Sequence, residues 1–139
     1  MPFDEDRVYV GIPSPDGPLA SGARVMVESR SGACRNLVLP AGKREFTWGW
    51  IAASTTCTAS AVLTDAVQVR DEPLPASEET RTPVWSALSV DFAVRFLLPL
   101  PPGEAWRLER REIIAWMRAW YQRKGISDLP EGLAPLPRP

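Results

Sequence analysis

The chain has 139 residues, of which 45% are hydrophobic and 24% are charged, and its formal net charge is −1. This length and composition predict one globular domain with its own core and exclude disorder of the whole chain. The near-neutral charge excludes a strong overall attraction to nucleic acid or to anionic membranes.

The start of the chain and its cysteines indicate a compartment. The first residues, MPFDED, are acidic and lack both the basic and the apolar part of a signal peptide. No apolar run approaches the roughly 20 residues that span a bilayer. Cys34 and Cys57 are too few for a disulfide scaffold, and two buried free thiols are a better interpretation than one bridge. We therefore expect a cytoplasmic protein that has no contact with membranes.

Short strands are predicted in the first third of the chain. Residues 7–12, 23–28 and 34–39 are rich in β-branched side chains and are bounded by Gly, Pro and Ser turns. Their close spacing predicts an antiparallel meander. The aromatic-glycine segment 46–50 is either a further short strand or an ordered lead into a helix.

Three helices are predicted after the meander. The first covers residues 55–69, although alternate positions at its start also fit a strand. The second covers 85–97 and ends before Pro99, and the third covers 109–124 and ends at Gly125. Between the first two helices, residues 71–83 are predicted to be an acidic, proline-bearing loop.

The fold class is therefore predicted to be α+β. About three to four antiparallel strands are expected to pack against about three helices. Residues 1–126 form one domain in this interpretation, and the proline-rich residues 127–139 form a C-terminal tail.

The residue inventory argues against familiar catalysis. The chain has no histidine, which removes the commonest general base and the commonest metal ligand. It also lacks a phosphate-binding glycine loop and a Cys-x-x-Cys pair. Its carboxylates gather in terminal and loop segments, so no metal or other cofactor is expected. The sequence predicts a protein that is not an enzyme, and an unfamiliar enzyme using Asp or Glu with a metal is a weaker hypothesis.

Two groups of residues are candidate binding sites. The candidate surface for a protein partner comprises two tryptophans and four loop carboxylates: Trp48, Trp50, Asp71, Glu72, Glu78 and Glu79. The alternative is a nucleic-acid surface at the last helix, made of Arg107, Arg110, Arg111 and Arg118. Each group also has a simpler interpretation, namely core tryptophans, a solvated loop and a solvated helix face.

Several segments resemble a family of small bacterial and phage proteins of unknown function. They are Arg7-Val8-Tyr9-Val10-Gly11, Arg24-Val25, Leu39-Pro40, Phe46-Thr47-Trp48-Gly49-Trp50, Trp106-Arg107-Leu108 and Glu112-Ile113-Ile114-Ala115-Trp116. The resemblance covers roughly residues 7–120. It departs at residues 51–56, where the family has a glycine- and proline-containing turn. It implies a phage or mobile-element setting and no established activity.

Together these points predict a non-enzymatic interaction protein of a phage or mobile element. It is expected to bind a host or phage protein in the host cytoplasm, and inhibition of a host defence system is one role open to it. A nucleic-acid-binding accessory protein is the alternative. Self-association is left open.

Overall fold

The structure is a computed structural model, and it describes the helices, the strands and part of the residues that connect them. The described residues are 7–17, 22–29, 32–37, 39, 46–49, 52–68, 83–127, 129 and 133. Residues 71–82 of the predicted acidic loop and the final residues 134–139 lie outside the described residues.

The strands form one antiparallel sheet, as the spacing of the first three runs predicted. They are β1 (Val8–Ile12), β2 (Arg24–Glu28), β3 (Cys34–Asn36) and β4 (Trp106–Glu109). Their order across the sheet is β3-β2-β1-β4, so the first strand lies between its hairpin partner and a strand from late in the chain. The fourth strand therefore lies directly before the last helix, where the sequence had not indicated a strand.

The helices follow the predicted order. They are α1 (Ala53–Ala66), α2 (Pro83–Phe92) and α3 (Arg110–Lys124), and α2 continues directly into a π-helical turn, η2 (Ala93–Leu97). The alternative strand interpretation of the first helical segment is thus excluded. As predicted, α3 ends at Gly125, whose φ of 68° places it in the left-handed region. These elements confirm the α+β class.

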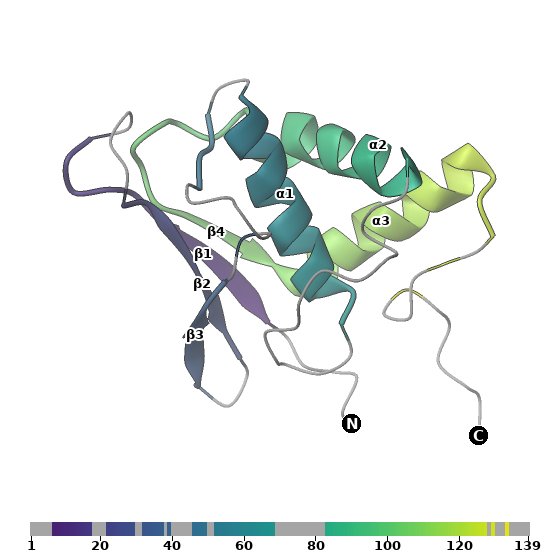
Figure 1. Cartoon of the computed structure of the whole chain (residues 1–139). Coiled ribbons are helices and arrows are strands. Elements are labelled where there is room, and N and C mark those ends of the chain that lie inside the picture. Colours follow the sequence, from purple (N-terminus) through teal and green to yellow (C-terminus); the bar gives the residue numbers. More distant parts are fainter. Residues whose placement is uncertain are drawn as a thin grey trace.

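The helices lie together on one face of the sheet, which gives two layers (Figure 1). Alternate strand residues such as Tyr9, Val25 and Val27 point into the core that the sheet shares with α1, α2 and α3. Leu133 is 1% exposed and belongs to this core. Packing therefore continues past the boundary that the sequence predicted at residue 126.

A glycine in β1 leaves room for the ring of a tryptophan in β4. A Cβ atom at Gly11 would lie 2.0 Å from Nε1 of Trp106, so only glycine fits beneath that ring. Trp106 in turn meets the ring of Trp48 edge to face, with 5.6 Å between centroids. This contact fixes the segment before α1 against β4.

Candidate functional site

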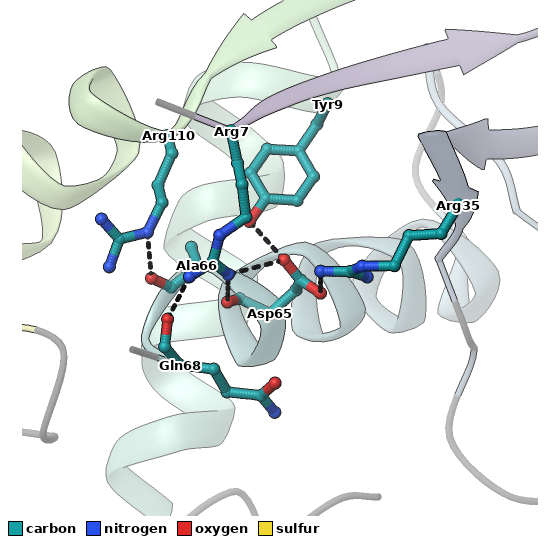
Figure 2. Close-up of polar contacts among 7 residues, drawn as sticks. All are labelled: Arg7, Tyr9, Arg35, Asp65, Ala66, Gln68 and Arg110. Carbon is teal, nitrogen blue, oxygen red and sulfur yellow. Dashed lines mark hydrogen bonds and ion pairs between the residues drawn. The ribbon is translucent and has the colours of Figure 1, made fainter. Parts of the chain in front are cut away.

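A buried polar cluster lies at the C-terminal end of α1 (Figure 2). We call it the Asp65 cluster, and its members are Arg7, Tyr9, Arg35, Asp65, Gln68 and Arg110. Asp65 projects from the last turn of α1 and is 4% exposed. The side chains around it come from β1, from β3, from the residue before β1 and from the start of α3. The cluster therefore joins both layers of the fold.

Both carboxylate oxygens of Asp65 are engaged. Oδ1 accepts hydrogen bonds from Nη1 of Arg7 at 3.0 Å and from the Tyr9 hydroxyl at 2.7 Å. Oδ2 forms an ion pair with Nη2 of Arg35 at 2.7 Å. A carboxylate so surrounded and so deeply buried links strands to a helix, and no face of it is open to a substrate.

The arginines also bind the carbonyl groups at the end of α1. Nη1 of Arg7 donates to the Asp65 carbonyl at 2.6 Å, and Nη2 of Arg7 donates to the Gln68 carbonyl. Nε of Arg110 donates to the Ala66 carbonyl at 2.8 Å. The last carbonyls of a helix lack intrahelical partners and carry partial negative charge. Guanidinium groups satisfy both needs at this helix end.

The cluster perturbs the titration of Tyr9. Complete burial raises the pKa of the Tyr9 phenol well above its ordinary value, because the phenolate would lose its hydration. The neighbouring Asp65 carboxylate raises that pKa further by charge repulsion, and Arg7 partly opposes it. Tyr9 is therefore a neutral hydrogen-bond donor over the physiological pH range.

Sequence reasoning did not select Asp65 or its partners. The available signal was a lone carboxylate among apolar residues of the first predicted helix, shortly after Leu63 and before Ala66 and Val67. A charged residue on a buried helix face requires a partner of opposite charge. Nothing in the sequence identified Arg7 and Arg35 as the partners of Asp65.

The predicted protein-binding residues are placed only in part. Trp48 is 3% exposed, and its indole Nε1 donates to the Glu104 carbonyl at 3.1 Å. It lies in the core, so its ring offers no contact surface. Trp50, Asp71, Glu72, Glu78 and Glu79 lie outside the described residues.

The four predicted nucleic-acid-binding arginines do not converge on one surface. Arg107 pairs with Glu28 across the sheet at 3.2 Å, and Arg111 pairs with Glu109 at 2.7 Å. Arg110 turns inward to the end of α1, as described above. Arg118 donates from Nε to the Leu133 carbonyl at 3.4 Å. Each guanidinium serves a different part of the fold.

An exposed row of small apolar side chains runs along α2 and η2. Val84, Val90 and Val94 are 37%, 48% and 57% exposed, and Ala87 lies exposed between the first two. We call these residues the valine ridge. Their spacings of three, three and four residues put them on one helix face. The opposite face, with Trp85, Leu88 and Phe92, is buried in the core.

Other candidate chemistry is sparse in the part of the chain that the structure describes. No group of three or more acidic or cysteine side chains there is arranged to hold a metal ion. Cys34 and Cys57 are both free, but Cys34 is exposed and Cys57 is half-buried, so the expectation of buried thiols was wrong. Among the described helices, none has the length and apolar character needed to cross a membrane.

Comparison with known proteins found no matching protein family, no similar curated protein and no similar solved structure. The family resemblance given above therefore stays a prediction.

Proposed function

We propose that this protein is a non-enzymatic interaction protein that inserts the valine ridge into an apolar groove of a protein partner. The observation that carries the proposal is the exposure of three valines on one face of a helix whose other face is packed in the core. Contiguous exposed apolar surface typically marks an interaction site.

The geometry of the ridge suits insertion into a groove. Amphipathic helices bind grooves through anchors three and four residues apart, which is the spacing of Val84, Ala87, Val90 and Val94. Valine has few rotamers to lose on binding, because its β-branch already restricts χ1. The helix is held in place by its own core contacts, so it needs no ordering when it binds.

Two charged residues accompany the ridge: Asp91 lies on the same helix face, between Ala87 and Val94, and Arg95 follows Val94. Asp91 accepts a hydrogen bond from Trp120 Nε1 at 2.8 Å, and the Arg95 guanidinium lies 5.1 Å from the Phe96 ring centroid. Both side chains are exposed, and the charged group of each makes one of these contacts. We therefore expect a groove whose apolar floor is flanked by groups that can bond to one carboxylate and one guanidinium.

The nucleic-acid alternative has weaker support. Its arginines are engaged in separate contacts, three of them with acidic or carbonyl groups of distant elements. Gripping a phosphate backbone needs several guanidinium groups along one surface. The host or phage origin of the partner, and inhibition as its consequence, stay predictions.

The proposal is tested by a charged substitution in the ridge. The partner is first captured from a nuclease-treated lysate of the source cells and purified, and its binding is then measured by titration calorimetry. Val94→Asp should weaken binding at least tenfold, because an aspartate would have to be desolvated in an apolar groove. Val94 is exposed, so the variant should fold like the wild type.

A matched control uses Ala115, an exposed alanine on α3. Ala115→Asp adds the same charge away from the ridge and should leave the affinity unchanged. Equal affinities for the wild type and Val94→Asp would refute the ridge as the binding surface. Capture that disappears with nuclease would support the nucleic-acid alternative instead.

A further inference from the structure

A charged corner lies where η2 packs beside α3 (Figure 1). We call it the Arg95 corner, and its members are Arg95, Phe96 and Trp116. The Arg95 side chain is exposed, and its guanidinium carbon lies 5.1 Å from the centroid of the Phe96 ring. That ring meets Trp116 of α3 edge to face, with 5.7 Å between centroids, and both rings are half-buried. The guanidinium therefore rests on an aromatic base that is partly open to solvent.

Arg95 has no counter-charge of its own. On an α-helix, a spacing of four residues would allow Asp91 and Arg95 to form an ion pair. Asp91 instead accepts a hydrogen bond from Trp120 Nε1 at 2.8 Å, and Arg95 lies in the wider π-helical turn η2. Among the described residues, the ion pairs all join other side chains. The Arg95 guanidinium thus has an aromatic neighbour and no carboxylate partner.

This arrangement prepares Arg95 to bind a carboxylate. A guanidinium that lies over a ring keeps its N–H donors free at its edge, and a carboxylate can accept two parallel hydrogen bonds from them. Because the planar group is already held by stacking, less freedom is lost when those bonds form. Arg107 and Arg111 differ from Arg95 in this respect, since each already binds a carboxylate of its own chain.

We propose that the Arg95 corner receives an aspartate or glutamate side chain of the partner protein that binds the valine ridge. The inference rests on the proposed function, because Val94 of the ridge directly precedes Arg95. The partner segment then combines apolar side chains, which cover Val90 and Val94, with one acidic side chain, which binds Arg95. The ridge supplies apolar contact area, and the corner selects acidic segments and rejects basic ones.

A single carboxylate fits this corner better than a polyanion does. Binding a nucleic-acid backbone requires several cations along one surface. The corner contains one guanidinium, and the neighbouring exposed positions Val90 and Val94 are apolar. An acidic side chain within an apolar segment matches both features.

Selection from a displayed library of random peptides tests the proposal with the full chain. The wild type should enrich peptides that join apolar residues to an aspartate or glutamate. Arg95→Glu should instead enrich peptides with lysine or arginine at the corresponding position, because the sign of the corner is reversed. Arg24→Glu makes the same charge change on an exposed arginine of β2 and should select like the wild type. Circular dichroism verifies that both variants are folded.

Calorimetry with one enriched acidic peptide measures the contribution of Arg95. Arg95→Glu should weaken binding roughly tenfold or more, and Arg95→Lys should weaken it less, because lysine keeps the charge. The affinity of the wild type should fall as salt rises, and the affinity of Arg95→Met should depend on salt much less. Equal affinities of the wild type and Arg95→Glu would overturn the proposal. A selection that enriches no peptide, or peptides without an acidic preference, would do the same.

The partner captured from the lysate separates this proposal from that of the ridge. If Val94→Asp weakens its binding and Arg95→Glu does not, the ridge proposal stands and the carboxylate proposal is overturned. If neither variant weakens its binding, both proposals are overturned. Weaker binding in both variants, with Arg24→Glu unchanged, supports both.

Discussion

Removing the charge of Asp65 should strongly destabilise the fold. Asp65→Asn keeps the shape of the side chain but leaves Arg7 and Arg35 without their buried counter-charge. Arg7 is 1% exposed, so water cannot replace the lost carboxylate. Breaking a buried ion pair from one side typically costs about 3–5 kcal/mol, because the remaining charge is buried and uncompensated.

That loss is a large part of the expected total. A domain is usually stable by about 5–15 kcal/mol, so Asp65→Asn should remove roughly a fifth or more of the free energy of unfolding. For a chain of this size the loss corresponds to a fall in melting temperature of roughly 10–15 °C. Urea titration followed by circular dichroism measures the free energy directly.

An exposed ion pair of the same protein supplies the control. Glu28→Gln breaks the Arg107–Glu28 pair, whose side chains are 61% and 42% exposed, and it should cost less than about 1 kcal/mol. The reasoning is refuted if Asp65→Asn costs as little as Glu28→Gln. That result would mean that Arg7 and Arg35 become hydrated once the charge of Asp65 is removed.

Two further substitutions test the contacts of β1. Because the pKa of Tyr9 is raised in the folded state, its contribution to stability is complete below about pH 10 and is lost as pH rises through the folded-state pKa. Tyr9→Phe should therefore flatten the decline of the urea midpoint above about pH 10, and equal declines in both proteins would contradict this. Gly11→Ala should displace the Trp106 ring and cost at least about 1–3 kcal/mol, measured by urea titration with tryptophan fluorescence. An unchanged midpoint would show that the ring can move without loss.

The local patterns of the sequence predicted most of the fold. Two patterns identified the elements correctly: the alternation in the first strands, and helical stripes such as Ile113, Met117 and Trp120. Both patterns depend only on neighbours along the chain. The turn signals at Pro99 and Gly125 likewise marked the ends of α2–η2 and α3. Such signals are local, so they can be read without knowing which elements pack together.

The sites depended on contacts between distant parts of the chain. Arg107 and Arg110 were grouped as one basic surface because both lie in the region of the last helix, where positive charges are in excess. In the structure β4 continues to Glu109, so Arg107 follows the period of a strand and Arg110 that of a helix. Because the strand ends and the helix begins between these two arginines, their side chains lie on opposite faces of the sheet. The pairing of Asp65 with Arg7 joins residues too distant for any local pattern to indicate.

The central position of β1 has a consequence for synthesis on the ribosome. Its first neighbour, β2, follows within one hairpin, but its second neighbour is β4, and Val8 pairs with Glu109. Until β4 has left the exit tunnel, one edge of β1 has no partner in the native sheet, and unpaired strand edges promote aggregation. Closing so long a loop is also slow. A nascent chain that ends before β4 therefore exposes the edge of β1 that is covered by β4 in the finished sheet. Protection by chaperones matters most at this stage.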